Sequence, residues 1–141
     1  MSTTYNDDIL YFDSVNILDL ASISQTPFYL YSEKIISNNF LTYQKSFGNN
    51  PNLICYSVKA NSNLSILSLL SKLGSGFDIV SGGELSRVIE AGGDPRKTVF
   101  SGVGKTEEEI RFALSQDIMC FNVESHDELV TINSIALEED K

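Results

Sequence analysis

One lysine, Lys59, stands where a parallel-sheet protein places its chemistry. It follows the apolar residues 53–58, which have the pattern of a buried strand, and α/β folds bind ligands and catalyse reactions at the carboxyl ends of their strands. Strand alternation predicts that Lys59 shares a face with Ser57 and Cys55. An amine partly desolvated there is suited to covalent attachment to a carbonyl group. The alternative is a lysine whose stem lies on the sheet and whose amine reaches solvent.

A carboxylate, Asp78, interrupts the next apolar strand, expected over residues 76–80. Carboxylates are rarely buried without a partner. One interpretation is a cationic partner, either a lysine or a protonated cofactor nitrogen. The other is a strand-end aspartate that bonds to the backbone.

Other motifs do not define a site. Residues 102–106 read Gly-Val-Gly-Lys-Thr, but a nucleotide-binding loop needs a glycine where this sequence has Val99, and Thr106 suits a helix cap. His126, the single histidine, is expected on a solvated first turn of a helix. Cys55 and Cys120 lie in apolar runs without CxxC spacing. We therefore expect no metal site and no disulfide framework.

Strand-like and helix-like segments alternate along the chain. Strands are expected at residues 28–31, 53–58, 76–80, 98–100 and 119–123, each followed by an amphipathic helix. Three helices begin with an S/T-x-x-E capping box, at residues 81–84, 106–109 and 125–128. Four strand–helix units from about residue 53 onward predict an α/β fold with a parallel sheet. The sheet is either an open doubly wound sheet or part of an eight-unit barrel.

The chain length bears on the choice between these two folds, and the net charge bears on the kinds of partner. A complete (β/α)₈ barrel takes about 250 residues, whereas this chain has 141. The net charge of −9 disfavours nucleic acid and anionic membrane surfaces as partners. No apolar run is long enough to span a bilayer, and the first residues do not resemble a signal peptide. We expect a cytoplasmic protein.

Four motifs, in order and spacing, resemble the N-terminal part of the diaminopimelate decarboxylase family. They are Tyr-Ser-Val-Lys-Ala-Asn (56–61), Phe-Asp-Ile-Val-Ser-Gly-Gly-Glu-Leu (77–85), Phe-Ser-Gly-Val-Gly-Lys-Thr (100–106) and Phe-Asn-Val-Glu-Ser (121–125). The resemblance runs from about residue 26 to residue 129. The lysine motif is shared with ornithine and arginine decarboxylases and with alanine racemases, whereas the other three favour the diaminopimelate branch.

The resemblance implies an activity and two site residues. The family decarboxylates meso-diaminopimelate to L-lysine with pyridoxal 5′-phosphate. Lys59 matches the lysine that holds this cofactor and is then placed for proton transfer. Asp78 matches an aspartate that lies near the cofactor. His126 does not match the family's ring-stacking histidine, which would lie later in the chain.

The resemblance also implies a domain organisation. Residues 1–30 would contribute a strand segment to a second, β domain, and residues 31–141 would form the N-terminal half of a pyridoxal-phosphate-binding (β/α)₈ barrel. The full-length family is expected to form homodimers. Because much of the family's site lies outside this sequence, we expect an incomplete fragment without stand-alone activity. The alternatives are a non-catalytic remnant, or another barrel-type decarboxylase (ornithine or arginine) or racemase.

Overall fold

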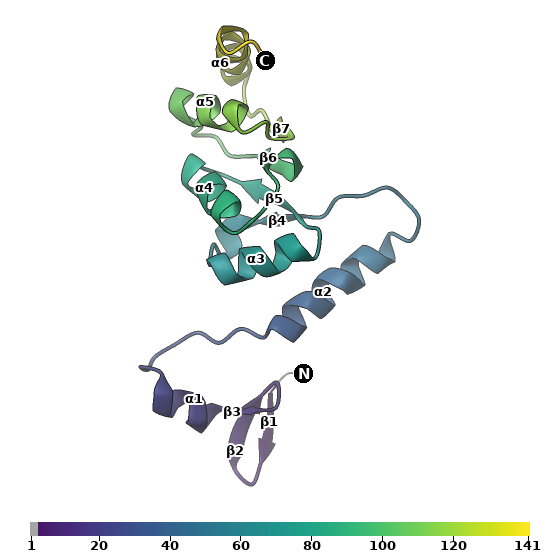
Figure 1. The fold of residues 1–141 in the computed structure, drawn as a ribbon, viewed down its shortest axis with the longest axis vertical. Coiled ribbons are helices and arrows are strands. Elements are labelled where there is room, and N and C mark those ends of the chain that lie inside the picture. Colours follow the sequence, from purple (N-terminus) through teal and green to yellow (C-terminus); the bar gives the residue numbers. More distant parts are fainter. Residues whose placement is uncertain (1–2) are drawn as a thin grey trace. The chain divides into compact units, whose positions relative to one another are not determined.

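The computed structural model describes residues 3–141, which divide into two compact units, one ending at Thr42 and one from Tyr43 to Lys141. The elements are labelled in Figure 1. The domain boundary expected near residue 30 stays a prediction. Among the described residues, no helix has the length and apolar character needed to cross a bilayer.

The first unit contains an antiparallel sheet of three strands, β1 (Thr3–Asn6), β2 (Ile9–Phe12) and β3 (Val15–Asn16). These strands were not predicted from the sequence. Two-residue loops join them, since Asn6 pairs with Ile9 and Phe12 pairs with Val15. All four loop residues, at positions 7, 8, 13 and 14, have positive φ, as type I′ hairpin turns require.

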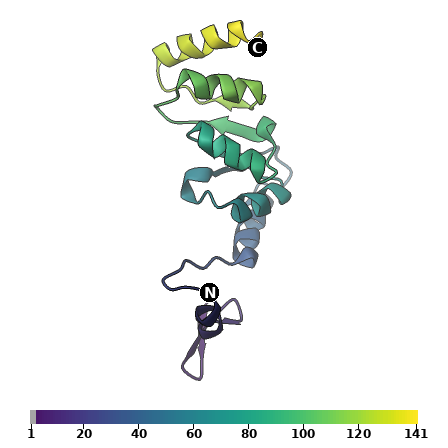
Figure 2. The same ribbon diagram turned by 60° about the vertical axis from the view of Figure 1, so that its left-hand side comes forward.

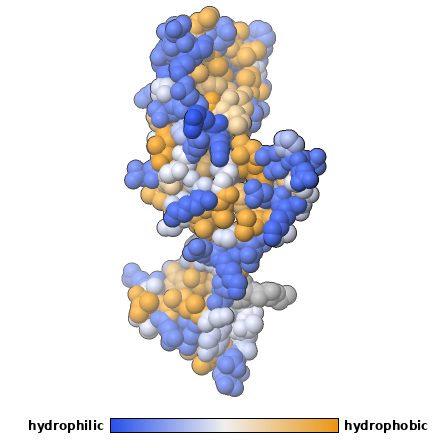
Figure 3. Space-filling view, turned by 45° about the vertical axis from the view of Figure 1, so that its right-hand side comes forward, coloured by the Kyte–Doolittle hydropathy of each residue, from blue (hydrophilic) through white to orange (hydrophobic). Residues whose placement is uncertain are grey.

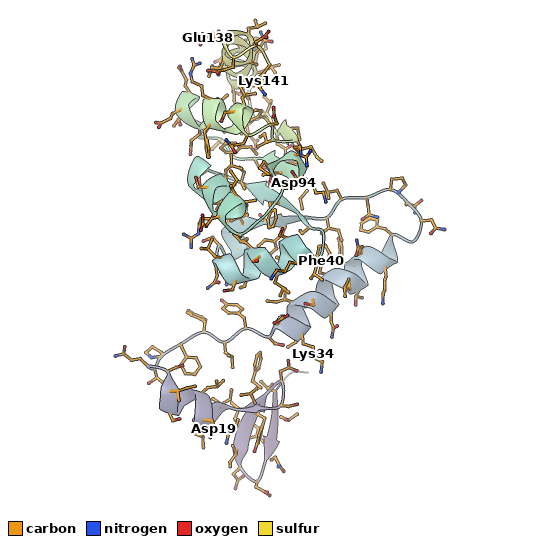
Figure 4. The ribbon with its side chains drawn as sticks, viewed as in Figure 1. Asp19, Lys34, Phe40, Asp94, Glu138 and Lys141 are labelled. Atoms are coloured by element: carbon orange, nitrogen blue, oxygen red, sulfur yellow. The ribbon has the colours of Figure 1, made fainter. Side chains whose placement is uncertain are left out.

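Two helices follow in the chain. Helix α1 (Ile17–Ile23) begins after Asn16, whose side chain accepts a hydrogen bond from the Leu18 N–H. The strand expected at residues 28–31 is wrong, because this segment has no strand pairing and Tyr29 is 90% exposed. Helix α2 (Glu33–Ser46) confirms the helical spacing and buries Phe40, which is labelled in Figure 4.

The second unit contains a parallel sheet in the order β4–β5–β6–β7. The strands are β4 (Cys55–Ser57), β5 (Gly76–Ile79), β6 (Thr98–Phe100) and β7 (Cys120–Phe121). The helices that follow them are α3 (Leu64–Lys72), α4 (Gly82–Glu90), α5 (Glu107–Ser115) and α6 (His126–Glu138). Two 3₁₀ turns, η1 (Val58–Ala60) and η2 (Pro95–Lys97), precede α3 and β6. The four strand–helix units predicted from the sequence are confirmed.

The strand order distinguishes the two predicted architectures, an open doubly wound sheet and part of an eight-unit barrel. Each strand pairs with the next strand in the chain, and crossovers between parallel strands are right-handed in nearly all cases. Sequential right-handed crossovers place every helix on the same face of the sheet, and Figure 2 shows this regular succession of strand and helix. A doubly wound sheet would reverse its order and cover both faces. The second unit is therefore part of a (β/α)₈ barrel.

The two faces of the sheet differ as this topology requires. Phe77, Ile79 and Phe100 are fully buried on the face that the helices cover. A further cluster joins α5 to α6 through Ile110 and Ile132. On the opposite face, Ser57, Asp78 and Val99 are only partly buried, and Cys120 is exposed. This opposite face corresponds to the interior of a barrel.

Large hydrophobic side chains are also exposed. Figure 3 shows hydrophobic surface among hydrophilic residues. In the second unit these side chains include Val103 at 88% exposure and Leu137 at 72%. Apolar surface of this kind is typical of a face that other polypeptide covers.

Candidate functional site

Lys59 lies on a turn beside the sheet and not on the strand. Strand β4 ends at Ser57, and the chain then forms η1, which contains Lys59 and contacts β5. The expectation that the strand continues to residue 58 is therefore wrong, and simple alternation no longer places Lys59. The expected partial desolvation is also wrong, because η1 carries Lys59 off the covered part of the sheet and leaves it exposed.

Three contacts fix the backbone around this turn. The Val58 side chain, next to Lys59, is fully buried. The Tyr56 hydroxyl donates to the Asn61 carbonyl at 3.2 Å, and Arg87 Nε of α4 donates to the Ser62 carbonyl at 2.9 Å. Lys59 is thus an exposed residue on a turn whose ends are held.

Asp78 is at the centre of a polar network at the carboxyl ends of the strands. Its Oδ2 accepts a hydrogen bond from the Ser57 hydroxyl at 3.1 Å, and its Oδ1 accepts one from the Ser101 hydroxyl at 2.5 Å. Asn122 Nδ2 in turn donates to Ser101 Oγ at 2.9 Å. The network spans all four parallel strands, because each residue lies in or directly after a different one.

The observed partners of Asp78 are two side-chain hydroxyl groups, which the sequence did not lead us to expect. A cationic partner for this carboxylate stays a prediction. Ser101 and Asn122 were not predicted as site residues from the sequence. Their signal was their position, since each directly follows an apolar strand, and the carboxyl ends of parallel strands meet at one edge.

The Lys105 ammonium makes all of its hydrogen bonds within the protein. Its side chain is 0% exposed, and its ammonium donates to the Gly102 carbonyl at 2.7 Å, the Asn122 carbonyl at 2.9 Å and Glu128 Oε1 at 2.5 Å. The hydrogen bond from Lys105 lowers the pKa of Glu128. Lys105 therefore does not present its charge to a phosphate group, which agrees with the rejection of a nucleotide-binding loop.

The three predicted capping boxes are only partly confirmed. The hydroxyls of Ser81, Thr106 and Ser125 each accept the N–H expected of a helix cap. Only Glu109 completes the box, by accepting from the Thr106 N–H at 3.0 Å. The other two carboxylates reach one residue further back. Glu84 accepts from the Val80 N–H at 2.7 Å, and Glu128 accepts from the Glu124 N–H at 3.1 Å.

Glu109 also joins two neighbouring loops. Its Oε1 accepts a hydrogen bond from the Gly82 N–H at 2.8 Å, at the start of α4. The backbone hydrogen bonds from Gly82 and Thr106 lower the pKa of Glu109. The helix starts at the edge of the site are therefore tied by a carboxylate that is ionised at neutral pH.

Cys55 lies deeper on the same face of the sheet. Burial raises the pKa of its thiol, and the negative charge of Asp78 and the neighbouring Cys120 raise it further. The thiol is therefore protonated at neutral pH and is not poised as a nucleophile.

The arrangement defines a class of site. An exposed primary amine lies on a turn against β5, and β5 carries a carboxylate held by two hydroxyls at the same edge. An amine can attach covalently to an aldehyde, and a fixed carboxylate can support positive charge close by. The fold and the site together define part of a (β/α)₈-barrel protein with an amine-and-carboxylate site at the carboxyl ends of its strands.

Comparison with known proteins gives the family. Residues 33–140 match the sequence profile described as "Pyridoxal-dependent decarboxylase, pyridoxal binding domain". The match covers most of the chain. The chain belongs to this family of pyridoxal-dependent decarboxylases, as the four motifs indicated.

Individual relatives agree in sequence and in fold. The chain is 54% identical over 132 residues to diaminopimelate decarboxylase of Vibrio cholerae, covering 94% of this chain and 32% of the relative. The crystal structure of diaminopimelate decarboxylase from Helicobacter pylori complexed with L-lysine matches with a TM-score of 0.86 and 50% identity, over 89% of this chain and 32% of that one. The diaminopimelate decarboxylase of M. jannaschii in complex with L-lysine matches with a TM-score of 0.91 and 35% identity, over 99% of this chain and 34% of that one. The chain thus spans about a third of the length of the relatives it matches.

Proposed function

We propose that this chain supplies part of the pyridoxal phosphate site of a diaminopimelate decarboxylase, which releases CO₂ from meso-diaminopimelate and yields L-lysine. The observation that carries the proposal is the placement of Lys59 on a turn against the strand of Asp78, in a chain 54% identical to such an enzyme. The relatives solved with L-lysine support the choice of substrate, because L-lysine is the product of that reaction.

The residues present fit the cofactor. Lys59 is a primary amine that is exposed and therefore accessible to an aldehyde. Asp78 is an acceptor whose two oxygens are already oriented by Ser57 and Ser101. When bound, pyridoxal phosphate supplies an electron-accepting ring that stabilises the electrons left behind by a departing carboxyl group.

Each residue has a distinct task in this proposal. Lys59 would hold the cofactor through its Nζ. When not attached to the cofactor, the Lys59 amine would be placed to move a proton at the substrate carbon that loses its carboxyl group. The Asp78 carboxylate supports positive charge on the bound cofactor. The hydroxyls of Ser57 and Ser101 keep that carboxylate from rotating.

The proposal extends to partners and location. Exposed hydrophobic residues of the second unit, such as Val103 and Leu137, would be covered by further barrel polypeptide or by a second subunit of a homodimer. Residues 1–30 would contribute to the β domain and residues 31–141 to the barrel. The two free cysteines are compatible with a reducing cytoplasm. The acidic net charge of −9 disfavours nucleic acid as a partner.

A chimeric enzyme tests the function directly. This chain would replace the matching third of the Vibrio cholerae enzyme, and CO₂ release would be measured with meso-diaminopimelate, L-ornithine and L-arginine. We expect release from meso-diaminopimelate alone. Release from ornithine or arginine in its place would contradict the proposed substrate.

Two lysine variants of the chimera test the site. Lys59→Ala should abolish CO₂ release, whereas Lys72→Ala, at an exposed lysine in the last turn of α3, should leave it unchanged. Full activity in the Lys59→Ala chimera would show that another group performs the chemistry.

A further inference from the structure

The Lys105–Glu128 ion pair is the most deeply buried ion pair among the described residues of the second unit. The Lys105 side chain is 0% exposed and that of Glu128 is 11% exposed. The ammonium also lies 5.7 Å from the centre of the Phe100 ring. Removing a charge from water is costly unless it is paired and hydrogen-bonded, and here every N–H of the ammonium has an acceptor.

The three acceptors of Lys105 lie in two loops and one helix. Gly102 lies in the loop after β6, and Asn122 lies directly after β7. Glu128 comes from the first turn of α6. A single buried amine therefore ties together two loops and one helix at the carboxyl edge of the sheet.

A chain of hydrogen bonds connects Lys105 to the Asp78 carboxylate. Lys105 holds the carbonyl of Asn122, whose side-chain amide donates to Ser101 Oγ. The Ser101 hydroxyl then donates to Asp78 Oδ1. The orientation of the carboxylate thus depends on Asn122, and the position of Asn122 depends on Lys105.

We propose that Lys105 is a positioning residue for the cofactor site: its buried ammonium fixes Asn122 so that Asn122 and Ser101 orient the carboxylate of Asp78. This inference rests on the proposed function, because it assigns Lys105 a role in holding pyridoxal phosphate. Lys105 itself does not touch the cofactor. Its effect is transmitted through Ser101.

A double-mutant cycle in the chimera tests the transmission. Lys105→Met keeps the apolar stem and removes the three donors, and Ser101→Ala removes the link to Asp78. The affinity for pyridoxal phosphate is measured by titration and the change in cofactor absorbance. We expect Lys105→Met to weaken binding about tenfold alone but less than about twofold in the Ser101→Ala background, because coupled residues are not additive. An equal loss in both backgrounds would overturn the proposal.

Lys105→Met leaves the buried Glu128 carboxylate without its partner, which could by itself cause misfolding. A second variant therefore tests the proposal with the ion pair intact. Asn122→Ala removes a side chain of an exposed residue and leaves the ion pair intact. It should also weaken pyridoxal phosphate binding, and this loss should likewise disappear in the Ser101→Ala background. The control Lys72→Met should bind the cofactor as the unchanged chimera does. Normal affinity in the Asn122→Ala chimera would overturn the proposal.

Amide hydrogen exchange, measured without cofactor, tests the positioning role of Lys105 independently of the proposed function. The Asn122 N–H donates to the Phe100 carbonyl, and the Gly76 N–H donates to the Ile54 carbonyl elsewhere in the sheet. Lys105→Met should speed exchange at Asn122 about tenfold and leave Gly76 unchanged. Equal acceleration at both amides would show general destabilisation and overturn the positioning role. If the unchanged chimera bound no pyridoxal phosphate, the proposed function would fail, whatever the exchange rates.

Discussion

Replacing Glu109 with glutamine should destabilise the second unit at neutral pH and have little effect in acid. The carboxylate accepts hydrogen bonds from the N–H groups of Gly82 and Thr106 and from the Thr106 hydroxyl, at 2.8–3.0 Å. Glutamine has one acceptor oxygen and no charge, so it cannot serve both loops. A bond to a charged group contributes about 1.5–3 kcal/mol when well protected. Because Glu109 is partly exposed, we expect a loss of about 1–2 kcal/mol.

The pH dependence follows from the lowered pKa of Glu109. A carboxyl group whose pKa is lower in the folded state stabilises the protein above its unfolded pKa, about 4.3 for glutamate. This stabilisation is lost as the pH falls through the folded-state pKa. The difference between the native protein and Glu109→Gln should therefore be full at pH 7 and shrink as the pH falls below about 4.3 and through the lowered folded-state pKa.

Urea unfolding followed by circular dichroism, at a series of pH values, measures this difference. Glu107→Gln is the matched control, because Glu107 is also in the first turn of α5 but is exposed. Both variants lose a charge near the same helix N-terminus, so only the effect of the two-loop contact differs. A Glu109→Gln loss that is no larger than that of Glu107→Gln, or that persists unchanged in acid, would refute the reasoning.

Two further predictions concern packing in the second unit. Gly93→Ala should destabilise it by about 1–3 kcal/mol, because a Cβ there would lie 2.6 Å from Val88 Cγ1 and 3.0 Å from the Val88 carbonyl oxygen. The control Gly83→Ala, whose Cβ would have its closest contact at 3.8 Å, should be neutral or stabilising in the same urea titration. Phe100→Ala should cost about 3–5 kcal/mol because Phe100 is fully buried, and Val103→Ala, at an 88% exposed residue, should cost less than about 0.5 kcal/mol. Equal losses within either pair would contradict the described packing.

The repeating half of the fold was predictable because its signals are local. Each strand of the second unit is apolar, and each of the helices α4, α5 and α6 begins with a hydroxyl residue that caps it. Such agreement between pattern and cap makes the element boundaries robust. The pattern could not predict which backbone N–H each glutamate of the first helical turn accepts from. That choice depends on the loop before each helix and, for Glu128, on the charge of Lys105.

The first unit was harder to predict for two reasons. The aromatic residues 28–31 have high β propensity, but a strand forms only where another strand pairs with it. The hairpins at residues 6–9 and 12–15 turn through aspartate and serine in place of the usual glycine, which weakens the sequence signal. An Asp-Asp pair between β-forming residues was the available clue.

The site was half predictable. Lys59 and Asp78 could be singled out by residue type, because a lysine and an aspartate stand out against apolar strands. Ser57, Ser101 and Asn122 are ordinary polar residues. Only the register of β4 to β7 brings the Ser57 and Ser101 hydroxyls to the Asp78 carboxylate and the Asn122 amide to Ser101. Their roles required the three-dimensional arrangement.

The most direct test of the central claim is to locate the lysine that holds pyridoxal phosphate. The chimera would be loaded with the cofactor and reduced with borohydride, and the modified peptide would be identified by mass spectrometry. The account predicts a single modified residue, Lys59. Modification of a different lysine, or modification spread over several exposed lysines, would contradict it.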